Sequence, residues 1–300
     1  MNVIIDCPTD FLSLKAFMKK HNISESEDPD CIIVNPGTDE YLDEKYFSNF
    51  ENLKVVGTPS TGVNHIDTKY LEGRNIKTFC LLDDRIGLES ITASAEFTWL
   101  HIMNAFRKFN LALEYVGDWR DDENEHFLRS NELSGKNILI IGLGRIGRKI
   151  KKYANAFEMN VDWYDPYIDV TSKNHIGSLR DLSKYDVISI NCYLTDETTG
   201  MIDKRLLSTT KSNALIVNTS RGEVVKEDDI CTLIKNGKII YSCDVLCNEQ
   251  NVEKLKESEL FKLNGQYDNL TITPHVAGAT IESQTKALES IIKLCKKYLS

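Results

Sequence analysis

Three side chains in the second half of the chain have the chemistry of an acid–base site. Arg221, Glu249 and His275 each lie a few residues after the end of an apolar, strand-like run. In an open parallel sheet, ligands bind outside the carboxyl ends of the strands, so residues in these positions can meet around one substrate. A histidine titrates near neutral pH and can move a proton in either direction. Taken singly, the arginine and the glutamate are more often solvated and the histidine more often structural, but together they predict an acid–base site.

The dinucleotide fingerprint Gly-x-Gly-x-x-Gly occurs at residues 142–147. It follows the apolar run Asn137–Ile141 and opens a helical stretch, which is the context that dinucleotide binding requires. The first glycine permits a tight turn, the second lets the backbone approach a pyrophosphate, and the third lets the helix pack closely on the strand. The N–H groups at the start of the helix can bind phosphate oxygens. The candidate cofactor-binding residues of this segment are Gly142, Gly144, Arg145, Ile146 and Gly147.

An acidic residue follows the next predicted strand. Asp165 comes directly after the run Val161–Tyr164, eighteen residues beyond Gly147. A carboxylate there accepts hydrogen bonds from the adenosine ribose hydroxyls and repels a 2′-phosphate, so it favours NAD over NADP. Neither Pro166 nor Tyr167 adds a cation that would attract such a phosphate. The alternative is a chance glycine turn beside a surface aspartate, and the joint presence of strand, helix and acid argues against it.

Short β-branched runs alternate with helical stretches along most of the chain. Because most of these runs are continuously apolar, they predict strands that are covered on both faces. Strand–helix alternation of this kind predicts a parallel, doubly wound α/β architecture. The predicted strands are Val3–Ile5, Cys31–Val34, Lys54–Val56, Lys77–Phe79, Asn137–Ile141, Val161–Tyr164, Val187–Ile190, Ala214–Asn218, Ile239–Cys243 and Leu270–Thr273. The clearest helical stretches are Asp10–Lys20, Arg145–Ala156, Lys226–Asn236 and Ile281–Tyr298.

The longest helical stretch without a strand signal, about residues 90–115, separates two strand–helix series. It predicts the connection between two domains, which is the number expected for a chain of this length. The final helical stretch has no strand after it, so it can pack back on the first domain and make that domain discontinuous. We therefore expect one domain from residues 1–93 plus 277–300 and a second from residues 94–276. The polar segment Asp118–Asn131 is expected to form an exposed loop or arm.

The chain has 36 basic and 45 acidic side chains, which give a net charge of −9. This balance argues against a nucleic-acid partner and against attraction to an anionic membrane. No apolar run approaches the roughly 18 residues of a membrane span, and the N-terminus lacks the basic region of a signal peptide. The eight cysteines are scattered without metal-ligand spacing, so we expect a reduced, cytoplasmic protein without a metal site.

Several ordered motifs together resemble the D-isomer-specific 2-hydroxyacid dehydrogenase family over nearly the whole chain. They are Pro59–Asp67, the glycine motif at 142–147, Asn218–Gly222 and Thr273–Gly278. The resemblance implies two doubly wound parallel-sheet domains, with a Rossmann cofactor domain inserted into a flavodoxin-like substrate domain. Residues 1–93 plus 277–300 would bind substrate and residues 94–276 would bind NAD. It further implies a homodimer, formed through the cofactor domain, that transfers hydride at C2 of a D-2-hydroxy acid or 2-oxo acid.

The resemblance also implies a role for each candidate side chain. Arg221 corresponds to the arginine that holds the substrate carboxylate and polarises the C2 oxygen, a task that suits a planar guanidinium. His275 corresponds to the general acid–base, and Glu249 to the carboxylate that bonds its other ring nitrogen and favours the imidazolium. Asp244 resembles the residue that binds the nicotinamide carboxamide. The loop whose backbone N–H groups bind the substrate carboxylate corresponds to Ser60, Thr61 and Gly62.

Other positions are weaker candidates. The residues Cys192, Thr198 and Thr219 are further candidates for contact with the cofactor, with ordinary loop packing as the alternative. Gln250 follows Glu249 where the family usually has proline, which loosens the placement of that glutamate. His65 and His101 have no partner motif and are interpreted as structural.

Two alternatives remain within this interpretation. One is phosphoglycerate dehydrogenase specifically, without its C-terminal regulatory domain. Relatives that oxidise phosphoglycerate often carry an arginine near Asn35–Thr38, and this segment has none, which weakens the case for a phosphorylated substrate. The other is an NAD-sensing binding protein on a dehydrogenase fold, because a fold alone does not establish a function. The complete set of Arg221, Glu249 and His275 argues against that alternative.

Overall fold

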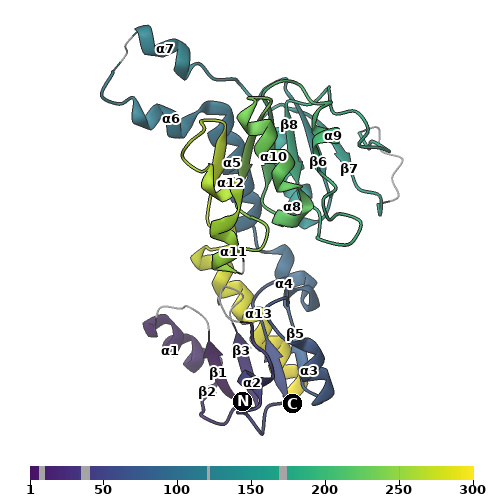
Figure 1. Cartoon of the computed structure of the whole chain (residues 1–300). Coiled ribbons are helices and arrows are strands. Elements are labelled where there is room, and N and C mark those ends of the chain that lie inside the picture. Colours follow the sequence, from purple (N-terminus) through teal and green to yellow (C-terminus); the bar gives the residue numbers. More distant parts are fainter. Residues whose placement is uncertain (7–10, 35–40, 120–121, 169–173, 250) are drawn as a thin grey trace. The chain divides into compact units, whose positions relative to one another are not determined.

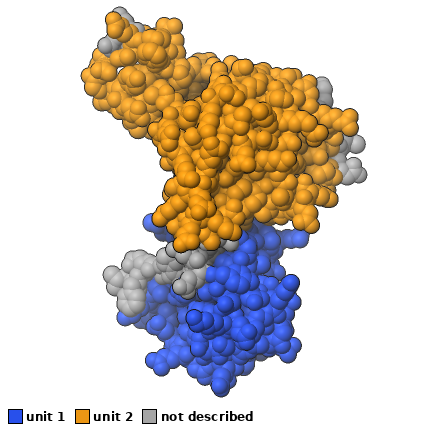
Figure 2. All heavy atoms as spheres, viewed as in Figure 1, with its two compact units in different colours: residues 1–91, 279–300 blue, residues 92–278 orange. Residues whose placement is uncertain are grey.

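A computed structural model describes residues 1–6, 11–34, 41–119, 122–168, 174–249 and 251–300 of the chain. The chain forms two compact units, shown in Figure 2. Unit 1 is Met1–Ile91 together with Ala279–Ser300, and unit 2 is Thr92–Gly278. Unit 1 is therefore discontinuous, since its last helix comes from the end of the chain. Among the described helices, none is both long and apolar enough to cross a membrane.

Unit 1 is built on a parallel five-stranded sheet with the order β2-β1-β3-β4-β5 (Figure 1). This is the flavodoxin-like order, and it confirms the predicted parallel α/β architecture. The strands are β1 (Asn2–Asp6), β2 (Ser24–Glu25), β3 (Cys31–Val34), β4 (Val55–Gly57) and β5 (Lys77–Phe79). The helices are α1 (Phe11–Lys20), α2 (Glu44–Phe47), α3 (Thr68–Gly73), α4 (Arg85–Glu89) and α13 (Ile281–Leu299), with a 3-10 turn at Leu81–Asp83.

Strand β3 shows why the apolar runs are continuous. All of its residues are fully buried. Cys31 and Ile33 pack in the cluster that contains the buried side chains of α13. Ile32 and Val34 pack in a second cluster with α2 and α3. Because successive side chains of a strand point to opposite faces, helices on both sides of the sheet require apolar residues at every position.

Unit 2 contains a parallel six-stranded sheet with the order β11-β10-β9-β8-β6-β7. The strands are β6 (Asn137–Ile141), β7 (Asn160–Tyr164), β8 (Val187–Ile190), β9 (Ala214–Asn218), β10 (Ile239–Cys243) and β11 (Leu270–Ile272). The longer helices are α5 (Ala93–Arg107), α8 (Arg145–Ala156) and α10 (Glu227–Lys235). The shorter ones are α6 (Phe109–Glu114), α7 (Asp122–Leu128), α9 (Lys204–Leu207), α11 (Val252–Glu257) and α12 (Glu259–Lys262), with a 3-10 turn at Gly222–Val224.

The strand order of unit 2 reverses at β6, which has β7 on one side and β8 on the other. This order follows that of a Rossmann sheet with β11 added at the far edge. Among the described residues, the third Rossmann strand is represented by an isolated parallel bridge between Trp163 of β7 and His175. Ligands of such sheets bind outside the carboxyl ends of the strands at the reversal point. The glycine motif and Asp165 directly follow β6 and β7, so both lie at that edge.

The predicted strands are all present, and two helical predictions are wrong in detail. The stretch 90–115 is interrupted at Lys108, whose φ is 50°, so it forms α5 and α6 instead of one helix. The segment Asp118–Asn131, expected as an exposed loop or arm, contains α7, a short and mostly polar helix without apolar periodicity to reveal it. The division into units falls after Ile91 and Gly278 rather than after residues 93 and 276. Which unit binds substrate stays a prediction.

Gly57→Ala should destabilise unit 1. A Cβ at this position of β4 would lie 2.3 Å from Cγ2 of Ile291 and 3.1 Å from Sγ of Cys295, both on α13. We expect a loss of about 1–3 kcal/mol in the free energy of unfolding, because overpacking a core displaces its side chains or backbone. Chemical denaturation measures this loss. Gly73→Ala is the matched control, since a Cβ there meets no atom within 4 Å, and it should be neutral or slightly stabilising. Equal losses in both variants would contradict the packing argument.

Candidate active site

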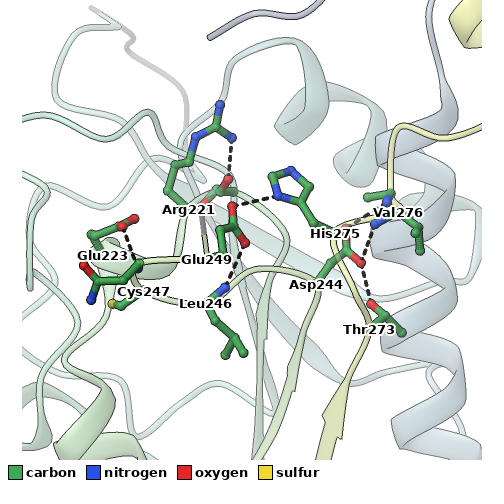
Figure 3. A network of polar contacts seen from close by, with 12 residues as sticks. Arg221, Glu223, Asp244, Leu246, Cys247, Glu249, Thr273, His275 and Val276 are labelled. Carbon is green, nitrogen blue, oxygen red and sulfur yellow. Dashed lines mark hydrogen bonds and ion pairs between the residues drawn. The ribbon is translucent and has the colours of Figure 1, made fainter. Parts of the chain in front are cut away.

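His275 lies in a tight turn just after β11, at the binding edge of the unit 2 sheet (Figure 3). Its backbone is left-handed, with a φ of 51°, which is uncommon for a residue other than glycine. Its N–H donates to the carbonyl oxygen of Asp244, just after β10, at 2.9 Å. The His275 side chain is 52% exposed. The ring is therefore anchored through its backbone and open to a ligand.

The buried carboxylate of Asp244 holds this turn. Asp244 is only 1% exposed. Its Oδ1 accepts a hydrogen bond from the N–H of Val276 at 3.0 Å, and its Oδ2 accepts one from Ala277 at 2.8 Å. The hydroxyl of Thr273 also donates to Oδ1, at 2.5 Å (Figure 3). Because a buried carboxylate needs such partners to offset its lost hydration, the chain after β11 wraps around Asp244.

Glu249 reaches the imidazole of His275 (Figure 3). Its Oε1 lies 2.7 Å from Nδ1 of His275, and its Oε2 accepts the N–H of Leu246 at 3.2 Å. The hydrogen bond with Glu249 raises the pKa of His275, and the charges of Glu249 and Asp244 add to this rise. Burial and the positive charge of Arg221 lower the same pKa, but the balance is a raised value. With Nδ1 held, Nε2 is the nitrogen that can exchange a proton with a ligand.

The loop that carries Glu249 is placed by contacts that the sequence does not reveal. Oε1 of Glu227 accepts the N–H of Cys247 at 2.6 Å. Gly222 lets the loop approach, because a Cβ there would lie 2.1 Å from the carbonyl carbon of Leu246. The glycine directly after Arg221 is the only local signal of this close approach. Both contacts join distant segments, so local patterns could not have located them.

Arg221 lies three residues after the end of β9 and is half-buried. Its Nη1 donates to the carbonyl oxygen of Ser220 at 2.7 Å, and its own carbonyl oxygen accepts from Nδ2 of Asn218 at 2.9 Å. Within the part of the chain that the structure describes, no carboxylate forms an ion pair with its guanidinium. A guanidinium without an internal ion-pair partner can bind an anionic ligand through two parallel hydrogen bonds.

The glycine motif forms the turn between β6 and α8, and its geometry fits a dinucleotide. Gly142 has a φ of 89°, and a Cβ there would lie 2.8 Å from backbone atoms of Asn191. A Cβ at Gly147 would lie 2.1 Å from the carbonyl oxygen of Gly142, so only glycine allows this packing of helix on strand. A Cβ at Gly144 would meet nothing within 4 Å, which leaves room for a ligand against the backbone. The side-chain oxygen of Asn191 is buried and has no hydrogen-bond partner among the described residues. A bound ligand could donate a hydrogen bond to it.

Asp165 is fixed beside this turn. Its Oδ2 accepts the N–H of Leu143 at 2.9 Å, and its Oδ1 accepts that of Tyr167 at 3.0 Å. Each carboxylate oxygen has a second lone pair, which suits the two hydroxyls of a ribose. The same negative charge would repel a 2′-phosphate. The donor and acceptor set at the ends of β6 and β7 therefore fits NAD.

Two of the three remaining cofactor candidates have hydroxyl groups that already have hydrogen-bond partners within the fold. The hydroxyl of Thr219 shares a hydrogen bond with that of Thr98 on α5, at 2.6 Å. The hydroxyl of Thr198 donates to the carbonyl oxygen of Tyr193 at 2.7 Å. Cys192 follows β8, and its backbone nitrogen would lie 2.8 Å from a Cβ at position 142. Cofactor contacts by these three residues stay predictions.

The predicted carboxylate-binding loop belongs to unit 1 and follows β4. Oγ of Ser60 donates to the carbonyl oxygen of Gly62 at 2.5 Å. Nε2 of the buried His65 lies 3.2 Å from Oγ1 of Thr58, so this histidine supports the start of the loop. Substrate binding by this loop, which includes Thr61, stays a prediction. Two positions discussed in the sequence lie outside the described residues, Gln250 and Asn35–Thr38.

Comparison with known proteins places these features in a common context. Residues 99–277 match the family model described as "D-isomer specific 2-hydroxyacid dehydrogenase, NAD binding domain". A glyoxylate reductase of Thermofilum pendens is 31% identical over 285 residues, which cover 89% of this chain and 77% of that enzyme. A D-3-phosphoglycerate dehydrogenase of Methanocaldococcus jannaschii is 31% identical over 289 residues, which cover 94% of this chain and 52% of that protein. The structure of a D-lactate dehydrogenase from Aquifex aeolicus, complexed with NAD and lactic acid, is similar with a TM-score of 0.78 and 26% identity, over 99% of this chain and 95% of that one.

Glu249→Gln should lower the pKa of His275. The amide preserves the length of the side chain but removes the negative charge and the charged acceptor that favour the imidazolium. We expect the pKa to fall towards the ordinary value for histidine, as followed by the pH titration of the His275 ring signals in NMR spectra. Glu253→Gln, an exposed acid on the nearby α11, is the control and should leave the titration unchanged. If His275 titrates identically in Glu249→Gln and in the unsubstituted protein, Glu249 does not raise the pKa of His275.

Proposed function

The chain belongs to the D-isomer specific 2-hydroxyacid dehydrogenases, and from this premise we propose that Arg221, Glu249 and His275 are its catalytic residues. The reaction is hydride transfer between NAD and C2 of a D-2-hydroxy acid or its 2-oxo form. The observation that carries the proposal is the 2.7 Å contact between Glu249 and His275 on the same sheet edge as Arg221. NAD, when bound, supplies the hydride acceptor of the oxidation and the hydride donor of the reduction.

His275 moves the proton. In the oxidation, its neutral imidazole accepts the proton of the C2 hydroxyl while the C2 hydrogen leaves as hydride, and the C2–O bond becomes a carbonyl. In the reduction, the imidazolium returns the proton to that oxygen. Glu249 keeps the proton on Nδ1, which leaves Nε2 to face the substrate oxygen. Because the pKa of His275 is raised, the imidazolium is populated to higher pH than in an ordinary histidine, which favours the reduction.

Arg221 binds the substrate carboxylate and stabilises negative charge on the C2 oxygen. The backbone N–H groups of Ser60, Thr61 and Gly62 are the proposed carboxylate-binding groups of unit 1. On the cofactor side, Asp244 accepts from the nicotinamide carboxamide and Asp165 from the adenosine ribose. The pyrophosphate is held at the start of α8, in the turn formed by Gly142, Gly144, Arg145, Ile146 and Gly147.

A small 2-oxo acid without a phosphate is the proposed substrate. The segment Asn35–Thr38 has no arginine for a phosphate, and the relatives of this chain include a glyoxylate reductase. Phosphoglycerate is the alternative substrate, because D-3-phosphoglycerate dehydrogenases are also among the relatives. NAD sensing without turnover is the alternative function.

NADH oxidation with a panel of small, aromatic, sugar-derived and phosphorylated 2-oxo acids tests this assignment. We expect turnover on the small unphosphorylated acids, followed by the absorbance of NADH, and much weaker activity with NADPH. Turnover restricted to a phosphorylated acid would support the phosphoglycerate alternative. Binding of NADH without turnover on any member would support the sensor.

His275→Asn should strongly reduce turnover and preserve NADH binding. Asparagine tolerates the left-handed backbone at this position better than alanine, so the turn is retained while the acid–base is lost. We expect kcat to fall by about 10²–10⁴-fold, the usual contribution of a general acid–base. Quenching of tryptophan fluorescence measures the Kd of NADH, which should be unchanged. His126→Asn, an exposed histidine of α7, is the control. Turnover at the unsubstituted rate in His275→Asn would refute the role of His275.

We also propose that unit 2 forms a homodimer. Large apolar side chains are exposed along the α5–α6 segment and the arm that follows it. They include Leu100 (54% exposed), Phe109 (57%), Leu113 (57%) and Trp119 (79%). Phe109 and Leu113 are one turn apart on α6, which projects from the sheet of unit 2 (Figure 1). Large exposed apolar side chains along one projecting segment favour a protein interface, and the family resemblance makes a second copy of this chain the occupant.

The double variant Phe109→Glu, Leu113→Glu should be monomeric, because two charges on one turn of α6 cannot be buried in an apolar interface. Size-exclusion chromatography with light scattering measures the mass. Ile86→Glu, which changes an equally apolar and 88% exposed side chain of unit 1, should remain a dimer. A monomeric unsubstituted protein at assay concentration would contradict the proposed dimer.

A further inference from the structure

A buried histidine that the reaction does not use lies beside the strands that end in the site. His101 is on α5 and is 3% exposed. Its Nδ1 lies 2.7 Å from Oγ of Ser242, and its Nε2 lies 3.1 Å from Oγ1 of Thr273. Ser242 is on β10 two residues before Asp244, and Thr273 follows β11 two residues before His275. Both nitrogens of the ring thus connect to the segments that present the site.

The carboxylate of Asp244 determines the direction of each hydrogen bond in this chain of contacts. An ionised carboxylate can only accept, so the hydroxyl of Thr273 gives its one proton to Oδ1 of Asp244, 2.5 Å away. Oγ1 of Thr273 must then accept from His101, which places the imidazole proton on Nε2. Nδ1 is left as the acceptor for the hydroxyl of Ser242. We call these four residues, Ser242, His101, Thr273 and Asp244, the His101 network.

We propose that His101 is a positioning residue for the reaction: it orients the hydroxyl of Thr273 and, through it, the carboxylate of Asp244 that holds the turn of His275. The proposal rests on the proposed catalytic role of His275. Two backbone N–H groups of that turn donate to the same carboxylate. A rotation of the Asp244 carboxylate would therefore displace the imidazole, and the His101 network removes this freedom.

Packing alone does not explain why a histidine occupies this buried position. The neighbouring Ile102 belongs to an apolar core, and the ring of Phe97 packs edge-on against the imidazole at 5.1 Å between centroids. In an apolar core, a buried polar side chain is unfavourable unless each of its polar atoms is hydrogen-bonded. A leucine would fill the same volume and would need no hydrogen bonds. Burial lowers the pKa of His101, and the charge of Asp244 opposes this only in part. The ring is therefore kept neutral, with the one donor and one acceptor that the network needs.

His101→Leu tests the positioning role, because leucine fills the space but cannot donate to Thr273. We expect kcat for the 2-oxo acid to fall about 10- to 100-fold, as for other small misplacements of a reacting group, with a much smaller change in KM. His101→Gln should recover most of the rate, since its amide N–H can donate to Thr273 in the same direction. Ile102→Val on the same helix is the matched control for lost packing and should lower the Tm with kcat unchanged. A lower Tm with an unchanged kcat in His101→Leu would overturn the proposal.

A second measurement does not depend on turnover. Nitrogen NMR of the histidine rings, with His101→Gln to identify the signals, reports which ring nitrogen carries the proton. We expect the neutral ring of His101 to be protonated at Nε2 at pH 7. Protonation at Nδ1, or a charged ring at that pH, would overturn the network.

The two proposals can fail separately. If the unsubstituted protein binds NADH but reduces no 2-oxo acid, the proposed function fails. The tautomer of His101 still tests whether the His101 network has the proposed hydrogen-bond directions. The His275 titration in His101→Leu then decides positioning. We expect the pKa of His275 to fall in this variant, because a displaced turn loosens the contact with Glu249. An unchanged titration would overturn the positioning role.

Discussion

A carboxylate taken out of water is unstable unless hydrogen bonds replace its hydration, and Asp244 is such a group, with 1% of its surface exposed. Two of its donors are backbone N–H groups of Val276 and Ala277, so it is satisfied only when the chain after β11 folds back over the end of β10. That fold requires the left-handed backbone of His275. The direction of the imidazole thus depends on satisfying a neighbouring carboxylate and not on the histidine alone.

The parallel order of the sheet brings the other groups to the same place. Strands β9, β10 and β11 are neighbours and run in one direction, so the segments after them start from one edge. Arg221, Glu249 and His275 are each delivered by one of these segments. Gly222 then allows the loop after β10 to pass close to the end of β9, which a side chain at that position would prevent. The strand order and the close backbone approach at Gly222 therefore bring the three candidate catalytic side chains to one edge of the sheet.

Local patterns predicted the parts of this arrangement that local physics determines. Continuous apolar runs marked the strands because helices cover both faces of each sheet, and the glycine motif marked its turn because a Cβ at Gly142 or Gly147 would collide with backbone. Contacts between distant segments leave no such mark. In the sequence, His101 is indistinguishable from any other histidine on a helix. Its partners, Ser242 and Thr273, come together because the register of β10 and β11 places Ser242 opposite Thr271. The helix α7 was missed for the opposite reason. Five of its seven residues are polar, and its two apolar residues, Phe127 and Leu128, are adjacent, so they show no helical periodicity.

Opposing charges set the proton affinity of His275. Glu249 and Asp244 favour the imidazolium, whereas burial and Arg221 oppose it. In the proposed reaction, a substrate carboxylate bound to Arg221 brings a compensating negative charge to that guanidinium and weakens its effect on the ring. The imidazolium is then most favoured when a 2-oxo acid is bound, which is when the reduction needs a proton. Because the 2-hydroxy acid keeps the same carboxylate, the ring can also regain a proton before the product leaves. The arginine would thus bind the substrate and, through its neutralisation on binding, increase the population of the acid that acts on it.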